Sequence, residues 1–481
     1  MAHRLERDSL GEVRVPADAY WGAQTQRALE NFPISGLRPD PMFLRGYAHQ
    51  KRASAAVNAR LGLLDPGLAG VIAQAAGEIL AGRLTDQFVV DPFQAGAGTS
   101  LHMNVNEVLA NRANEIRGGK LGEYRPVHPN DHVNFGQSTN DTFPTALRLA
   151  ILLRRVDLDG RLEQLARAFA DKAALLAGVV TAGRTHLQDA TPITLGQVMA
   201  GYSGMLARAG ERLADAAGPL HELGIGGTAV GTGVNRHPDY PRLVCEELSL
   251  DLGFALVPAA NPIAMHASTQ DFAAYAASLK GAALEASRIA NDLRLMASGP
   301  TSGLGEIILP AVQPGSSIMP GKVNPVMAEN LNMVAFHVLG AEAAVAAASE
   351  AGQFQLNVMM PVIAFEILFS MEILANAFRV FRERCVEGIT ADAERARAYA
   401  ERTVSLATML TPLTGYDRAA AIVKRALAEG RSILETAAEE LGIPEAQVRT
   451  LLDPLRWTEP GVVRGNPGAP ESGAERGGSA G

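Results

Sequence analysis

The chain has 481 residues, of which 47% are hydrophobic but only 5% aromatic, and its formal net charge at pH 7 is −8. The length allows a large buried core, and an apolar content made mostly of Ala, Leu and Val favours closely packed long helices over a sheet-rich fold. Charges of both signs are interspersed along the sequence, which argues against a nucleic-acid-binding surface.

Cys245 and Cys385 are the two cysteines of the sequence. They are far apart along the chain, and we interpret them as buried thiols in a reducing cytosol. The first residues lack the apolar segment of a signal peptide, and we find no run of about 18 apolar residues. These features predict a cytoplasmic protein without a membrane span.

Residues 1–140 have a mixed pattern that is mostly helical, with several prolines in the first forty residues. Helical patterns are found at residues 42–62, 66–82 and 104–117. Gly118 and Gly119 end the last of these helices. Residues 86–92 predict a short extended segment.

Residues 141–395 are dominated by long helical patterns. Asn140 or Asp141 can cap the first helix, with Pro144 in its first turn. The other four long helices are expected at residues 195–216, 269–297, 328–351 and 361–384. Five helices of this length predict a bundle, and several are apolar nearly all round, which indicates burial by other subunits.

Residues 396–462 predict a small C-terminal helical domain. Its shorter helical patterns are found near residues 391–410, 416–428, 431–441 and 444–453. Residues 463–481 are rich in glycine, and we expect this tail to be disordered.

Residues 315–325, with the sequence GSSIMPGKVNP, are the most informative stretch of the chain. Two glycines and two prolines predict a loop, and the loop carries two hydroxyls, an amine and an amide. A phosphate-binding P-loop would need a glycine at position 316 and a hydroxyl at position 323, where the chain has Ser316 and Val323. We therefore interpret the segment as a mobile loop that can close over a small anionic substrate.

A second glycine-rich run lies at residues 224–229 and fits a relaxed dinucleotide fingerprint. It follows a helical pattern rather than a strand, and no βαβ unit surrounds it, so we expect a tight turn beside the active site instead. No cluster of Asp, Glu, His or Cys has metal-ligand spacing. The sequence therefore predicts neither a metal nor a cofactor.

The loop at residues 315–325 resembles the signature loop of the aspartase/fumarase superfamily, whose members eliminate a small group from a succinyl skeleton. Residues 98–104, 137–141 and 183–189 also resemble the family, and the resemblance runs from about residue 10 to about residue 462. It implies a mainly α fold of three domains, with a central five-helix bundle that assembles into a tetrameric helical core. It also implies a homotetramer whose active sites are shared between chains and accept a small dicarboxylate.

Site residues can be carried over from the family motifs one by one. The resemblance implies that Ser316 is the base, which removes a proton next to a carboxylate. Burial in a dry site with nearby positive charge and amide N–H groups would be needed to ionise such a serine. The hydroxyls expected to stabilise the resulting aci-carboxylate are those of Thr99, Ser138, Thr139 and Ser317.

The remaining site residues face the other end of the substrate. Lys322 and Asn324 would bind the carboxylate on the carbon that bears the leaving group. Thr185 and His186 would lie near the leaving group, and Glu329 stands where the family pairs an acid with this histidine. Taken alone, His186 is a polar core histidine satisfied by Glu329, and this interpretation is compatible with the catalytic one.

Several positions depart from the family pattern or add to it. His102 replaces an asparagine that is common in the family, Thr301 stands where an arginine is usual, and Met360 stands where aspartases often have a glutamate. Residues 128–131 resemble a secondary anion-binding turn of fumarases, but we interpret them first as a capped turn.

Single residues and short motifs, which are less specific than the loop, distinguish an ammonia-lyase from a hydratase. Ala97 and Thr139 are typical of aspartases, and the side-chain carbonyl of Asn140 can accept a hydrogen bond from an ammonium group. Residues 21–24 and 226–227 look more like fumarase. The balance predicts an aspartate ammonia-lyase that converts L-aspartate to fumarate, with a class II fumarate hydratase as the alternative. A non-catalytic structural homologue is a third possibility, against which the intact loop argues.

Overall fold

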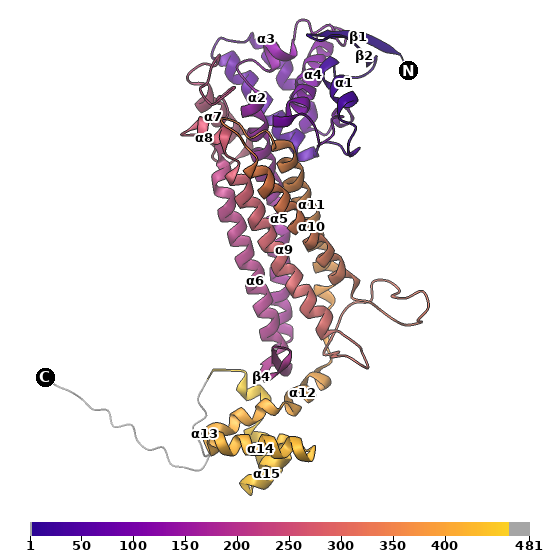
Figure 1. Ribbon diagram of the computed structural model, residues 1–481, viewed down its shortest axis with the longest axis vertical. Coiled ribbons are helices and arrows are strands. Elements are labelled where there is room, and N and C mark those ends of the chain that lie inside the picture. The colour runs from indigo at the N-terminus through magenta and orange to yellow at the C-terminus, as the bar shows by residue number, and fades with distance from the viewer. Residues whose placement is uncertain (1, 461–481) are drawn as a thin grey trace, which may run out of the picture. The chain divides into compact units, whose positions relative to one another are not determined.

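The computed structural model describes residues 2–460, which form two compact units (Figure 1). The first unit comprises the chain up to Gln164 together with Leu206–Arg288 and Glu329–Arg379. The second comprises Leu165–Met205, Ile289–Ala328 and the chain from Val380 onwards. The sequence-based boundaries at residues 140, 395 and 462 follow the chain rather than these units and stay a prediction. The tail at residues 463–481 lies outside the described residues.

The first unit begins with an antiparallel hairpin that the sequence analysis missed. Its strands are β1 (His3–Asp8) and β2 (Gly11–Pro16), which pair in register from His3–Pro16 to Asp8–Gly11. Four helices follow, namely α1 (Ala23–Asn31), α2 (Pro41–Arg60), α3 (Pro66–Leu80) and α4 (Thr99–Ile116). Asp40 and Asp65 cap α2 and α3, each with a proline at the first helical position.

The segment at residues 86–92 is not the extended strand that its composition predicts. It opens with a 3₁₀ turn at Thr85–Gln87 and continues without regular structure. Asn104 accepts a hydrogen bond from the backbone N–H of Val89 and donates to the carbonyl of Gln87. Because a side chain satisfies these backbone groups, the segment has no need of a partner strand.

Five long helices confirm the mainly α prediction. They are α5 (Thr139–Leu175), α6 (Leu195–Ala217), α9 (Gln270–Met296), α10 (Val326–Glu350) and α11 (Met360–Arg384). Figure 1 shows the parts of these helices within the first unit running side by side. Each contributes fully buried side chains there, for example Leu147, Leu213, Leu279, Leu331 and Met371.

The start of α5 lies two or three residues earlier than the sequence predicts. The helix begins at Thr139, and Ser138 Oγ accepts a hydrogen bond from the backbone N–H of Asn140, so Ser138 is the capping residue. Pro144 therefore lies in the second turn rather than the first. Shorter elements complete the first unit: β5 (Glu222–Leu223), α7 (Tyr240–Leu252), β6 (Val257–Pro258) and α8 (Pro262–Ala267).

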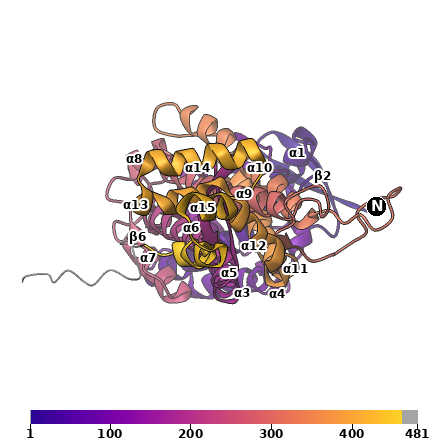
Figure 2. The same ribbon diagram turned by 90° about the horizontal axis from the view of Figure 1, so that it is seen from below.

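The second unit contains a hairpin, a two-strand contact and the C-terminal helices. The strands are β3 (Val180–Thr185), β4 (Gln188–Thr194), β7 (Ile307–Ile308) and β8 (Thr390–Ala391), paired antiparallel as β3–β4 and β7–β8. The helices are α12 (Ala393–Arg402), α13 (Thr411–Thr414), α14 (Tyr416–Glu429), α15 (Ile433–Leu441) and α16 (Glu445–Leu451). Figure 2 shows α14 and α15 next to each other at this end of the chain.

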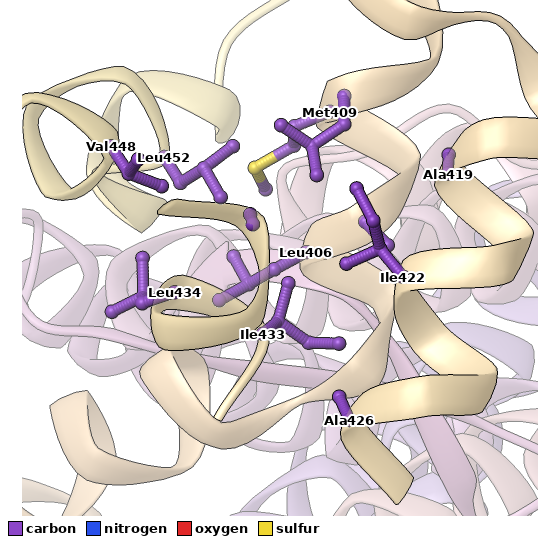
Figure 3. Close-up of a cluster of buried hydrophobic side chains, with 12 residues drawn as sticks. Leu406, Met409, Ala419, Ile422, Ala426, Ile433, Leu434, Val448 and Leu452 are labelled. Carbon is purple, nitrogen blue, oxygen red and sulfur yellow. The ribbon is translucent and has the colours of Figure 1, made fainter. Parts of the chain in front are cut away.

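The C-terminal helices enclose their own apolar core (Figure 3). Leu406, Ile422, Ile433 and Val448 from different elements are buried in it. The single helix expected at residues 391–410 is wrong, because α12 ends at Arg402 and a 3₁₀ helix follows. Thr403 is fully buried in an extended conformation, and its side chain accepts a hydrogen bond from Ser405 N, which breaks the helix.

Two of the long helices are strongly apolar, although neither contains an unbroken run of about 18 apolar residues. Val326–Glu350 and Met360–Gly388 have mean hydropathies of 1.5 and 1.6 and could cross a membrane by length and composition alone. A core helix of a soluble protein passes the same test. In the first unit these helices expose large apolar side chains, including Met333 at 64% and Phe336 at 63%.

Candidate active site

The turn that precedes α4 depends on an unusual backbone. Ala97 has φ 60° and donates its N–H to the carbonyl of Val358 at 2.7 Å, and Gly98 has φ 85°. A Cβ at Gly98 would lie 2.0 Å from the ring of Phe143, so only glycine fits. This turn places Thr99 at the first position of α4, where its side chain is exposed.

The start of α5 is held by a buried carboxylate. Asp141 accepts hydrogen bonds from the backbone N–H groups of Ser138 at 3.0 Å, Gly226 at 3.0 Å and Thr228 at 2.9 Å. Burial raises the pKa of Asp141 to about 7 despite these three donors. The glycine-rich run at residues 224–229 is therefore a turn that docks on the helix bearing the predicted site hydroxyls.

A small cavity in the first unit joins four residues singled out by the sequence. Thr139, Asn140 and Ala97 line it, and Met360 and Thr269 line it as well. Asn140 Nδ2 donates to the carbonyl of Ala229 at 2.7 Å, which leaves Oδ1 as the free acceptor of this amide.

His102 does not line this cavity but contacts Thr139, which does. It is buried, and its Nδ1 lies 2.7 Å from Thr139 Oγ1. Its Nε2 lies 2.8 Å from the Nζ of Lys51, a fully buried lysine that the sequence analysis did not identify. The sequence contained a signal for this residue, because Lys51 lies in an Ala-rich helical segment, where a buried charge requires a hydrogen-bonding partner.

The hairpin β3–β4 of the second unit carries the predicted leaving-group residues at its turn. Thr185 ends β3, and His186 and Leu187 form a two-residue turn with φ 55° and 58°. All three side chains are exposed in the single chain, and the pairing of His186 with Glu329 stays a prediction. Both φ values are in the left-handed region, which fits the twist of a tight hairpin.

Glu306 anchors this hairpin and was also missed by the sequence analysis. It is fully buried, accepts the hydroxyl of Thr181 at 2.6 Å, and forms an ion pair of 2.7 Å with Arg184. The guanidinium of Arg184 also lies over the ring of Tyr399. The residue next to Thr185 is thus fixed by a buried ion pair.

The loop at residues 315–325 is closed by its own hydrogen bonds. Gly315 N donates to the carbonyl of Lys322 at 2.9 Å, and Asn324 Nδ2 donates to the carbonyl of Gly315 at 2.7 Å. Ser316 Oγ accepts the backbone N–H groups of Met319 at 2.9 Å and Ile318 at 3.3 Å. Backbone donors of this kind stabilise a negative charge on the oxygen that they face.

The predicted site residues are distributed over both units. Ser317 and Lys322 are exposed in the loop of the second unit, together with the hairpin turn. Glu329 lies half-buried in the first turn of α10 and belongs to the first unit, as do Thr99, Ser138, Thr139 and Asn140.

Two further expectations can be compared with the structure. His128 Nδ1 accepts the backbone N–H groups of Asn130 and Asp131, which confirms the capped turn. Cys245 and Cys385 are buried free thiols, and burial raises the pKa of each to about 12. Among residues 2–460, no group of three or more His, Cys, Asp or Glu side chains could hold a metal ion.

Comparison with known proteins agrees with this arrangement. The family model described as Lyase matches residues 11–340, and the model described as Fumarase C C-terminus matches residues 406–459. The chain is 46% identical over 460 residues to an aspartate ammonia-lyase of Bacillus sp, covering 96% of this chain and 98% of that protein. It is 48% identical over 465 residues to a class II fumarate hydratase of Halobacterium salinarum, covering 96% and 99%.

The fold of the chain is also similar to those of solved structures. A fumarate lyase:delta crystallin from Brucella melitensis, described as bound to cobalt, superposes with a TM-score of 0.93 at 47% identity, covering 95% of this chain and 100% of that chain. A class II fumarase from Schistosoma mansoni gives 0.92 at 34% identity, covering 95% and 99%. The fold and the matched motifs define a helical lyase. The chain belongs to the aspartase/fumarase superfamily within that class.

Proposed function

We propose that this lyase is an aspartate ammonia-lyase, which eliminates ammonia from L-aspartate to give fumarate. The observation that carries the choice of substrate is the orientation of Asn140. Its Nδ2 donates one N–H to the carbonyl of Ala229, which leaves the second N–H and the Oδ1 acceptor for a ligand. An ammonium group has only donors and matches this acceptor.

The cavity supports the same choice. Ala97 lines it beside Thr139 and Asn140, and the methyl group of Ala97 offers no hydroxyl that could orient a water molecule. A hydratase must position such a water, whereas an ammonia-lyase has to hold an amine. A site built around an amine also rejects analogues that leave its hydrogen-bonding groups unpaired.

The proposed reaction begins with proton removal. Ionised Ser316 takes a proton from the methylene carbon of L-aspartate, and the electron pair moves into the adjacent carboxylate to form an aci-carboxylate. The N–H groups of Ile318 and Met319 favour the charged form of the serine. The hydroxyls that would hold the aci-carboxylate are those of Thr99, Ser138, Thr139 and Ser317.

Collapse of the aci-carboxylate breaks the carbon–nitrogen bond. Ammonia leaves, and the new double bond gives fumarate, while the abstracted proton stays on Ser316 until the site is reset. In this proposal Lys322 and Asn324 hold the second carboxylate. Thr185 and His186 serve the leaving group, with Glu329 as the partner of His186.

The proposed assembly is a homotetramer in which each site draws residues from more than one chain. Met333 and Phe336 on α10 are more than 60% exposed in the single chain, and burying such a face against other copies would remove it from water. Two unpaired buried thiols are consistent with a cytoplasmic location.

Absorbance of fumarate, followed with L-aspartate and separately with L-malate, tests the proposal. We expect fumarate from L-aspartate without added cofactor and a much slower reaction with L-malate. Equal or faster dehydration of L-malate would instead support the class II fumarate hydratase, which the 48% identity to such an enzyme keeps as the second candidate. A chain inert towards both would be a non-catalytic homologue.

A further inference from the structure

A buried hydrogen-bond network lies directly behind Thr139. Lys51 on α2 is fully buried, and its Nζ lies 2.8 Å from His102 Nε2, 2.9 Å from Gln137 Oε1 and 3.1 Å from Asn134 Oδ1. An ammonium group has three N–H bonds, and three acceptors surround this one. A charge so far from water is stable only when its donors are satisfied in this way.

Two neighbours indicate that Lys51 is the donor in each of these contacts. Gln137 Oε1 also receives the Nε2 group of Gln50 at 2.9 Å, so this oxygen is an acceptor. Burial lowers the pKa of Lys51 well below its usual range, but the negative charge of Asp141 acts in the opposite direction. The carboxylate of Asp141 is itself held by three backbone N–H groups.

These contacts determine which nitrogen of His102 carries the proton. Nε2 faces Lys51 Nζ, and with that ammonium group as the donor Nε2 presents its lone pair. Burial and the charge of Lys51 lower the pKa of His102 well below its usual value and outweigh a hydrogen bond to Asn134 that raises it, so the ring is neutral. The single ring proton is then on Nδ1, which lies 2.7 Å from Thr139 Oγ1.

We propose that Lys51 and His102 are positioning residues that fix the direction of the Thr139 hydroxyl. Because Oγ1 accepts from His102 Nδ1–H, the hydroxyl proton of Thr139 points away from the ring and is available to a substrate carboxylate. In the opposite arrangement Thr139 would donate to the ring and present only lone pairs to an anion. The proposal rests on the proposed function insofar as Thr139 binds the substrate carboxylate.

The tautomer of His102 can be measured without any substrate. In protein labelled with ¹⁵N-histidine, solid-state NMR should find Nδ1 protonated and Nε2 unprotonated, with the signal assigned by its loss in His102→Asn. A ring protonated at Nε2, or at both nitrogens, overturns the proposal. Because this readout needs no turnover, it stands even if neither L-aspartate nor L-malate is a substrate.

A double-mutant cycle tests whether the network acts through Thr139. Lys51→Met should lower kcat for fumarate formation by tenfold or more, in line with the loss of about 10²–10³ on removal of an oxyanion donor. In a Thr139→Val background the same change should cost no more than about twofold, because the hydroxyl to be oriented is gone. Equal losses in both backgrounds would mean that Lys51 acts only on the fold.

Two variants of His102 distinguish a role in positioning Thr139 from a purely structural role. His102→Asn offers an amide N–H near the place of Nδ1 and should keep most of the activity, whereas His102→Leu should not. Lys280→Met is the matched control, since Lys280 is an ion-paired lysine on α9 that contacts Glu342 and not the network. It should leave kcat unchanged. If Lys51→Met fails to fold, the NMR result on the unmodified protein still decides the proposal.

Discussion

Asn324 donates a hydrogen bond of 2.7 Å to the carbonyl of Gly315 and so closes the loop that carries Ser316. This contact gives Asn324 a task besides the carboxylate binding that its motif predicts. One amide N–H holds the loop, which leaves the second N–H and Oδ1 for a ligand. The geometry around the proposed base thus depends on a residue nearly at the other end of the loop.

The first prediction concerns the base itself. Ser316→Ala should lower kcat by about 10²–10⁴-fold, the usual contribution of a general base. The half-buried hydroxyl holds only two backbone N–H groups in place, so the thermal midpoint should stay within a few degrees of the parent. Stopped assays of fumarate and thermal denaturation check both parts. Retention of a substantial share of the parent rate would remove Ser316 from the mechanism.

The second prediction separates a steric clash from backbone strain. Gly98→Ala should destabilise the protein strongly, because a left-handed φ costs about 1–3 kcal/mol and the new methyl group also meets Phe143. Gly118→Ala is the matched control, with φ 81° and no atom within 4 Å of the added Cβ. Thermal denaturation at one protein concentration should show the larger loss for Gly98→Ala, and equal losses would contradict the clash.

The third prediction concerns substrate choice. Ala97→Ser adds a hydroxyl to the cavity beside Asn140 and should raise the ratio of L-malate to L-aspartate turnover, because the hydroxyl can orient a water molecule. Ala95→Ser, two residues earlier and outside the cavity lining, should leave the ratio unchanged. An unchanged ratio in Ala97→Ser would show that this position does not select the leaving group.

The fourth prediction concerns shared sites. The Ser316→Ala and His186→Ala variants should each lose most of the activity. If the protein forms the proposed homotetramer, subunits mixed after mild denaturation and refolding should regain part of it. The reason is that hybrid assemblies contain some sites whose serine and histidine are both intact. Activity of the mixture is compared with each variant refolded alone. Absence of any recovery in verified hybrids would place both residues of a site on one chain.

The fifth prediction is a pH dependence of stability. A hydrogen bond from Arg112 lowers the pKa of Glu78, whose side chain is 7% exposed. The pair therefore stabilises the fold above the unfolded pKa of about 4.5, and that stability is lost as pH falls through the lower folded pKa. Glu78→Gln should lower the urea midpoint at pH 7, and the difference from the parent should shrink towards pH 3. A difference independent of pH would exclude the linkage.

Much of the fold could be predicted because periodic apolar residues and glycine stops mark helices locally. The bounds of α6 and α9 agree with their predictions to within one residue, since Gly218 and Gly299 end the patterns clearly. The extended segment at residues 86–92 failed because its hydrogen-bond partner, Asn104, lies on another element. Long-range partners of this kind leave no periodic signal.

In the candidate site, too, the residues marked by local sequence motifs could be predicted, and those that depend on distant partners could not. Motif residues such as Ser316 and Thr139 were accessible from the sequence, because their neighbours along the chain are part of the signal. Lys51 and Glu306 were missed, since each is explained only by partners more than fifty residues away, His102 and Arg184. Buried polar residues that support a site are therefore found by asking what satisfies them in three dimensions.

Glu306 anchors the chain just before the loop that carries Ser316. Glu306 is locked to Thr181 and Arg184, β7 ends at Ile308, and α10 begins at Val326. We expect any closing movement of the loop to be confined to the chain between Ile308 and Val326, because β7 and α10 bound it. Lengthening or stiffening that tether, for instance at Val312, should alter the rate of loop closure and product release while the chemistry at the serine stays the same.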